Sequence, residues 1–174
     1  MIGDRTPRRI ALVGCGGSGK TTRARELGER LALPVFHLDG IFWQRGWQAM
    51  ERATFVAEQE RIMAGEAWVV DGNYGGTMRA GVGRADLVIF LDFPTWTCLS
   101  GIFRRWWTYR GQVPPGQSSG NPERLTLEFV LWVLTYRRQR RRRVLQMLED
   151  HAAEFVALAD RSEIPQLIER LAAR

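Results

Sequence analysis

The stretch that decides the fold is ALVGCGGSGKTT, from Ala11 to Thr22. Its spacing matches GxxxxGK[ST], the pattern of a phosphate-binding loop, through Gly14, Gly19, Lys20 and Thr21. An apolar run precedes the pattern and a segment with helical spacing follows it, which is the context that such a loop requires. The glycines would allow backbone N–H groups to surround a phosphate, and the start of the helix would add partial positive charge.

Lys20 is the only lysine in the chain, because every other basic residue apart from the two histidines is arginine. A compact ammonium group fits a phosphate cradle better than a forked guanidinium does. We therefore expect Lys20 to reach the β- and γ-phosphates of a nucleoside triphosphate and the Thr21 hydroxyl to bind Mg²⁺. The other residues expected to hold the triphosphate are Gly14, Gly16, Gly17, Ser18, Gly19 and Thr22.

The rest of the chain predicts an α/β fold. Five short, mainly apolar runs have the character of strands in a parallel sheet: 9–14, 35–39, 68–72, 87–93 and 155–160. Segments with helical spacing lie between or after them: 20–31, 53–64, 95–109, 124–150 and 164–172. This alternation favours a doubly wound sheet with helices on both faces, and 174 residues with 45% hydrophobic composition fit a single domain spanning 1–174.

Charge and composition limit the possible partners. A net charge of +6 favours contact with phosphates, whether of a nucleotide, a nucleic acid or a membrane surface. Cys15 and Cys98 form no metal or disulfide pattern, so a reducing cytoplasm is the simplest compartment. The N-terminal apolar run is too short for a secretory signal, and the longest apolar window, 87–103, contains Asp92 and Pro94 and is too short to span a bilayer. We expect no membrane partner.

Three predicted strands end in aspartate, where the carboxyl ends of parallel strands form functional sites. Asp71 follows the hydrophobic run WVV, as does the acid that holds magnesium in many P-loop proteins. Asp39 ends the second strand, where it would bind the acceptor or take its proton. Asp92 fits a site residue and a helix cap equally well.

Segment 109–125 is rich in Pro, Gly and Ser and offers little to bury, so we expect a mobile lid or surface loop. An arginine run, 137–143, follows it. At 100° per residue, Arg138 and Arg141 share a stripe with the leucines at 127, 131, 134, 145 and 148. A buried arginine needs an anionic partner, which a triphosphate would provide for Arg138 and Arg141. We expect Arg140, Arg142 and Arg143 to form a solvated face.

The segments GCGGSGKTT, VVDGNY and ADLVIFLDFP resemble, in this order, the phosphate loop, third strand and fourth strand of small P-loop kinases of the adenylate kinase type. With HLDGIFWQRGW, the chain is similar to the bacterial topology modulation proteins. The resemblance spans about residues 8–171. It implies strand order 2-3-1-4-5, ATP and Mg²⁺ as cofactors, and a lid that closes over the phosphates. It also implies that Arg105 corresponds to an arginine just before the lid and that Arg138 and Arg141 act on the transferred phosphoryl group.

The acceptor site departs from the adenylate kinase pattern. Gly75 stands where those kinases place an arginine that grips the monophosphate, and Arg79 and Arg84 are candidate substitutes. Other candidate acceptor-binding residues are Asp39, Trp43, Arg45 and Asn73. His37, inside the second predicted strand, is expected in the core. The aromatic residues of RRWWTYR fit core packing or stacking on nucleic-acid bases.

These expectations favour an ATP-dependent phosphotransferase that moves the γ-phosphate to a small-molecule acceptor, such as a nucleotide or nucleoside. The alternative is a nucleic-acid-associated ATP-binding protein that affects DNA topology and uses the outer arginines on DNA. A GTPase switch is not favoured, because the chain lacks an NKxD-like guanine motif. The sequence leaves open the identity of the acceptor and whether the protein is a monomer or a homodimer.

Overall fold

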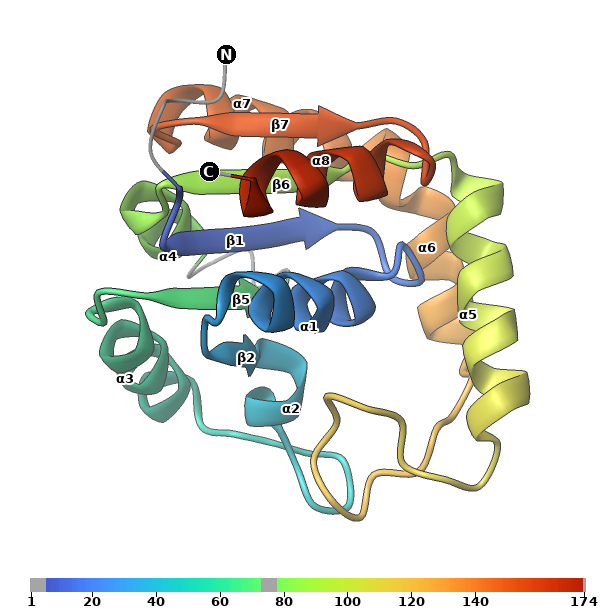
Figure 1. The fold of residues 1–174 in the computed structure, drawn as a ribbon. Helices are drawn as coiled ribbons and strands as arrows, with labels where there is room; N and C mark the ends of the chain where they lie inside the picture. The colour runs from blue at the N-terminus through green and yellow to red at the C-terminus, as the bar shows by residue number, and fades with distance from the viewer. Residues whose placement is uncertain (1–5, 73–77, 174) are drawn as a thin grey trace.

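The structure, a computed structural model, describes residues 6–72 and 78–173. Strands and helices alternate along the chain (Figure 1). In chain order they are β1 (Arg9–Gly14), α1 (Lys20–Leu31), β2 (Val35–His37), α2 (Leu38–Phe42), β3 (Trp43–Gln44), β4 (Gln48–Ala49), α3 (Arg52–Met63), β5 (Trp68–Asp71), α4 (Met78–Arg84), β6 (Leu87–Leu91), α5 (Thr95–Tyr109), α6 (Leu127–Gln139), α7 (Arg141–His151), β7 (Phe155–Leu158) and α8 (Glu163–Ala172).

A parallel sheet of five strands has the order β2-β5-β1-β6-β7. Counting only these strands along the chain gives 2-3-1-4-5, so the predicted α/β class and strand order are confirmed. β1 lies in the centre, with Leu12 opposite Asp71 of β5 and Gly14 opposite Leu91 of β6. The phosphate loop therefore leaves the sheet from its middle strand, between the ends of two neighbours.

The two faces of the sheet build two cores, because successive side chains of a strand point to opposite faces. In β1, Ile10 and Leu12 belong to a core that also contains residues of α1, α5, α6 and α8. Ala11 and Val13 belong to the other core, with residues of α3, α4 and α7. In Figure 1, α1 and α8 lie in front of the sheet and α4 and α7 behind it. Both faces are covered, which explains why the strands are apolar almost throughout.

α5 packs backbone to backbone against the phosphate loop. A Cβ at Gly101 would overlap the carbonyl oxygen of Gly17, and a Cβ at Gly17 would overlap the carbonyl oxygen of Cys98. Gly17 also has φ +77°, in the left-handed region that glycine adopts most easily. The loop therefore has its shape because glycine stands on both sides of this contact.

The predicted helix over 124–150 is wrong in its extent and in its buried side. Arg140 interrupts it with φ −120° and ψ −33°, so α6 and α7 are separate helices. Val133 and Tyr136 of α6 are buried, whereas its leucines at 127, 131 and 134 are exposed. Apolar residues occur all around α6, so helical periodicity could not identify the side that faces the core.

Two smaller predictions also differ from the structure. β2 ends at His37, and Asp39 lies in the short helix α2 instead of ending the strand. Segment 109–125 was expected to bury little, but Asn121 is 0% and Glu123 is 6% exposed. Across the described ranges, the helices fall short of the length and apolar character that crossing a bilayer demands.

The contact between α5 and the loop is testable with alanine. Gly101→Ala should lower the free energy of unfolding by about 1–3 kcal/mol, because the new methyl group would force apart two backbones that cannot bend away locally. Gly83→Ala, in α4, is the matched control, since the nearest atom to its Cβ is 4.0 Å away. It should be neutral or stabilising by up to about 1 kcal/mol. Urea denaturation of the three proteins measures both effects, and equal stability of the two variants would contradict the packing argument.

Candidate functional site

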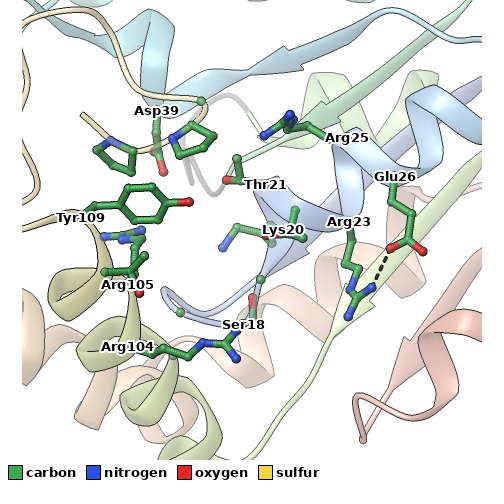
Figure 2. A pocket seen from close by; sticks show the side chains of 18 of the residues that line it. Ser18, Lys20, Thr21, Arg23, Arg25, Glu26, Asp39, Arg104, Arg105 and Tyr109 are labelled. Carbon is green, nitrogen blue, oxygen red and sulfur yellow. Dashed lines mark hydrogen bonds and ion pairs between the residues drawn. The ribbon is translucent and has the colours of Figure 1, made fainter. Parts of the chain in front are cut away.

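A cavity of about 630 Å³ opens beside the phosphate loop. It lies between the start of α1, the second half of α5, the start of α8 and residues 114–117 (Figure 2). Of the residues predicted from sequence, those that line it are Gly17, Ser18, Gly19, Lys20, Thr21, Thr22, Asp39 and Arg105. The cavity is therefore formed around the motif that decided the fold.

The start of α1 has the properties of an anion site. Gly19 precedes the helix with φ 94°, no described side chain caps the helix, and its first turn contains no acid. A Cβ at Gly19 would meet nothing within 4 Å, so open space lies beside these backbone amides. Ser18 is buried, and its hydroxyl donates to the carbonyl of Cys15 at 2.8 Å, which holds the loop in shape. Amides at a helix start with neither cap nor acid fit a phosphate.

The Lys20 ammonium group is held over the same loop. Its Nζ donates to the carbonyl oxygens of Gly14 at 2.8 Å and Cys15 at 2.9 Å. The Cys15 side chain adds no negative charge, because a hydrogen bond with Cys98 and burial raise the pKa of the Cys15 thiol. The loop thus presents one cation and a set of backbone amides.

Asp71 is buried at the end of β5, and both of its oxygens have partners. Thr21 Oγ1 donates to Oδ2 at 2.9 Å, and His37 Nδ1 donates to Oδ1 at 2.5 Å. This places the predicted pair of Mg²⁺ ligands, Thr21 and Asp71, in direct contact. The described residues include no group of three or more His, Cys, Asp or Glu that would hold a metal alone. The arrangement instead fits Mg²⁺, which is commonly held by one or two protein groups together with substrate phosphates.

The sequence predicts His37 in the core but gives no sign of its contact with Asp71. The parallel register places His37 directly opposite Asp71 on the neighbouring strand, and its side chain is 18% exposed. The register of β2 against β5 brings this pair together. The sequence does not reveal that register, because the two residues are 34 positions apart.

Arginines surround the cavity, and sequence reasoning identified only one of them there. Arg105 pairs with the buried Glu123 at 3.0 Å. Arg104 and Arg161 also line the cavity, and Nη2 of Arg161 donates to the carbonyls of Gly17 and Thr97, both at 3.2 Å. Arg161 follows the last strand of the sheet, and no motif marked it. The lining also contains Lys20, Arg23 and Arg25, and the acids Glu26, Glu29 and Asp39. Basic side chains outnumber acidic ones in the cavity, which suits an anionic ligand.

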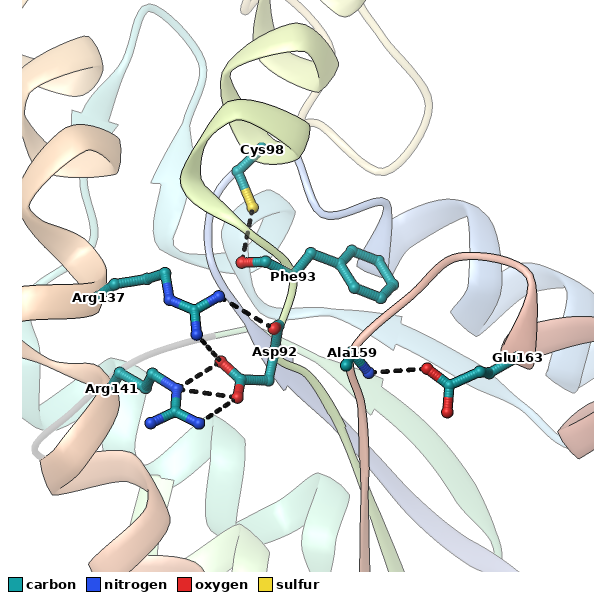
Figure 3. Close-up of polar contacts among 7 residues, drawn as sticks. All are labelled: Asp92, Phe93, Cys98, Arg137, Arg141, Ala159 and Glu163. Atoms are coloured by element: carbon teal, nitrogen blue, oxygen red, sulfur yellow. Dashed lines mark hydrogen bonds and ion pairs between the residues drawn. The ribbon is translucent and has the colours of Figure 1, made fainter.

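Arg138 and Arg141 are not among the residues that line the cavity. Arg141 forms a forked ion pair with Asp92, with Nε 2.7 Å from Oδ1 and Nη2 2.6 Å from Oδ2 (Figure 3). The hydrogen bond to Asp92 raises the pKa of Arg141. Arg138 is exposed on α6. Asp92 therefore joins β6 to α7, and contact of these arginines with a phosphate stays a prediction.

The predicted acceptor residues do not gather in one place. Nη2 of Arg79 lies 2.6 Å from Nε2 of His151. Arg79 does not line the cavity. Asn73 lies outside the described residues. Trp43 and Arg45 belong to a small hairpin, β3-β4, next to Asp39 in sequence but not in the lining of the cavity.

Asn121 fastens this hairpin to segment 109–125. Its Nδ2 donates to the carbonyls of Trp43 and Gln44 at 2.9 and 3.0 Å, and its Oδ1 accepts from the backbone N–H of Trp47 at 2.9 Å. The guanidinium of Arg124 lies 4.1 Å from the centre of a Trp47 ring. The hairpin and the segment are thereby one packed unit.

Segment 109–125 also contacts Thr21 and His37. A Cβ at Gly116 would lie 2.6 Å from Thr21 Cγ2 and 3.1 Å from His37, so the backbone here touches both. The predicted lid is thus in contact with the phosphate-loop side of the site as well as with the hairpin. Its role as a lid stays a prediction.

Replacing Asn121 tests the link between the hairpin and the segment. Asn121→Ala should lower the free energy of unfolding by about 1–3 kcal/mol, because it removes three part-buried hydrogen bonds and the body of a fully buried side chain. Ser119→Ala, two positions earlier and exposed, should change it by less than about 0.5 kcal/mol. Chemical denaturation measures both. A loss no larger for Asn121→Ala than for Ser119→Ala would show that the three hydrogen bonds do not hold the unit together.

Solved structures of other proteins share this fold. A shikimate kinase from Acinetobacter baumannii in complex with shikimate is 19% identical, with a TM-score of 0.54 over 95% of this chain and 91% of that one. A shikimate kinase from Bacteroides thetaiotaomicron is 20% identical, with a TM-score of 0.54 and 96% and 97% coverage. A gluconokinase from Sinorhizobium meliloti 1021 is 16% identical, with a TM-score of 0.54 and 97% and 91% coverage.

No protein-family model and no curated protein matches the chain. The chain has the fold of shikimate kinases and gluconokinases, and likeness at these identities establishes the fold alone.

Proposed function

We propose that the protein is an ATP-dependent phosphotransferase that moves the γ-phosphate of Mg-ATP to a hydroxyl group of a small molecule. The observation that carries this proposal is the meeting of Lys20, Thr21 and Asp71 beside an uncapped helix start that opens into a cavity. Cation, metal ligands and backbone amides are the parts that phosphoryl transfer requires, because the enzyme acts mainly by positioning and charge stabilisation.

The positions of the residues suggest a separate role for each in binding Mg-ATP. The backbone amides from Gly17 to Thr22 would bind the phosphate oxygens, and Lys20 would exchange two loop carbonyls for the β- and γ-phosphates. Thr21 and Asp71 would hold Mg²⁺, with His37 orienting the carboxylate from the other side. The bound Mg-ATP would supply the phosphoryl group and its leaving group.

Asp39 and the arginines complete the proposal. Asp39 lines the cavity from the first turn of α2, just after β2, where it would orient the acceptor hydroxyl or take its proton. Arg104, Arg105 and Arg161 would stabilise negative charge on the phosphates. Arg141 could join them only by leaving Asp92, so its role depends on a rearrangement of α7. Arg138 is exposed on α6 and does not line the cavity, so its role would require a movement of α6.

The acceptor class remains part of the proposal. The similar structures are kinases named for shikimate and gluconate, which carry hydroxyl groups and a carboxylate. A cavity lined by arginines is compatible with an anionic acceptor of this type and with a nucleotide. Nucleic-acid association, the other candidate, is supported by exposed Arg142 and Arg143 and by Arg110, which lies 5.3 Å from a Trp107 ring.

ADP formation from Mg-ATP is the decisive measurement. We expect one small acceptor, from a panel of shikimate, gluconate, nucleosides and nucleoside monophosphates, to stimulate it, and Lys20→Ala to reduce turnover by at least about a hundredfold. Arg52→Ala, at an exposed position of α3, serves as the control and should retain activity. Stimulation by DNA alone would instead favour a nucleic-acid-associated ATP-binding protein. ATP binding without turnover on any acceptor would contradict a phosphotransferase of this substrate range.

The metal role of Thr21 is tested by removing only its hydroxyl. Thr21→Val should weaken ATP binding in the presence of Mg²⁺ by about tenfold or more and leave binding in EDTA nearly unchanged, because the lost group is a metal ligand. Thr21→Ser keeps the hydroxyl and should behave as the parent protein does. Calorimetric titration with ATP measures each affinity. An equal loss for Thr21→Val with and without Mg²⁺ would assign the hydroxyl to another role.

A further inference from the structure

Most of the exposed large apolar side chains in the described ranges belong to two helices, α5 and α6. Their exposed fractions are high for Trp, Phe and Leu. They are Trp96 (71%), Phe103 (48%), Trp107 (72%), Leu127 (74%), Leu131 (50%) and Leu134 (44%). The core does not account for these residues, and the proposed phosphotransfer does not use them.

On each helix the exposed residues form one stripe. Trp96, Phe103 and Trp107 are seven and four positions apart, which places them on one side of α5. Leu127, Leu131 and Leu134 are four and three positions apart on α6. The opposite sides supply core residues, Cys98 and Ile102 from α5 and Val133 and Tyr136 from α6. α5 and α6 pack against each other, as Figure 1 shows, so the two stripes lie on neighbouring helices.

Arginines accompany the apolar stripes. Arg138 continues the leucine stripe of α6 by one further turn and is exposed. Arg110, directly after α5, places its guanidinium 5.5 Å from a Trp106 ring and 5.3 Å from a Trp107 ring. Glu128 is the only acid within the two helices, residues 95–109 and 127–139. The charge carried by these two helices and by Arg110 is therefore mainly positive.

We propose that α5 and α6 bind the protein to the surface of an anionic lipid bilayer. The exposed Trp, Phe and Leu side chains would enter the boundary between headgroups and acyl chains, and Arg110 and Arg138 would contact lipid phosphates or carboxylates. Tryptophan beside arginine suits this depth, because the ring has an apolar body and a polar edge. The proposal is independent of the phosphotransfer. It departs from the expectation of no membrane partner, which rested on segments that enter or cross a bilayer, because it concerns attachment to the membrane surface alone.

The charge pattern favours a bilayer over a second copy of the chain. Two copies that met through this face would bring like-charged arginines together, which disfavours association. An anionic bilayer instead attracts each basic residue near its surface. None of the six apolar residues lines the cavity at the phosphate loop, and each is open to solvent, so this surface is separate from the candidate site.

Sedimentation of the full-length protein with vesicles tests the proposal. We expect binding to vesicles of phosphatidylcholine mixed with phosphatidylserine, little binding to phosphatidylcholine alone, and loss of binding in high salt. Phe103→Ser with Trp107→Ser should weaken binding tenfold or more, and Leu131→Ser with Leu134→Ser should do the same. Val113→Ser is the control, because Val113 is 40% exposed but lies outside both helices. Far-ultraviolet circular dichroism and thermal unfolding identify any variant that fails to fold.

The two double variants act on different helices, so each outcome is informative. Loss of binding in both, with Val113→Ser unaffected, supports one membrane-binding surface made by α5 and α6. No binding of the parent protein to anionic vesicles overturns the proposal. So does equal binding by the parent and both folded double variants. A dimer in sedimentation velocity that the same variants dissociate, without vesicle binding, would assign the surface to a second copy and overturn the proposal as well.

Discussion

The buried carboxylate of Asp71 is the constraint on which the site depends. A carboxylate removed from water must be paired or hydrogen-bonded, and here α1 supplies Thr21 and β2 supplies His37. These contacts join α1 and β2, which follow each other in the chain, to the end of β5, which is distant in sequence but pairs with β2 in the sheet. Satisfying one buried acid thereby fixes the start of α1, and with it the phosphate loop, relative to the neighbouring strands.

α5 connects this centre to the rest of the molecule. One side meets the loop through Gly17 and Gly101, another supplies Cys98 and Ile102 to the core, and a third contributes Arg104 and Arg105 to the cavity. The remaining side carries the exposed Trp96 and Trp107. Because one rigid helix shares all of these contacts, a change in its position would reach the loop, the cavity and the outer surface together.

Segment 109–125 joins the helix to the acceptor-side hairpin. Arg105 meets Glu123, Asn121 holds the hairpin backbone, and Gly116 touches Thr21. Proline, glycine and serine content indicated an irregular segment, and that is its backbone character. Composition could not indicate that single polar residues would be buried there, because their partners come from the hairpin and from α5.

The sequence by itself determined the phosphate loop, the α/β class and four helices to within about one residue at each end, because these depend on local pattern and on glycines required by backbone geometry. Tertiary structure decided which side of α6 is buried, the break at Arg140, the pairing of Arg141 with Asp92 and the presence of Arg104 and Arg161 at the cavity. It also decided that His37 faces Asp71, since strand register places them opposite each other. Periodicity and motifs act over a few residues, whereas burial and ion pairing depend on partners that only the folded chain brings together.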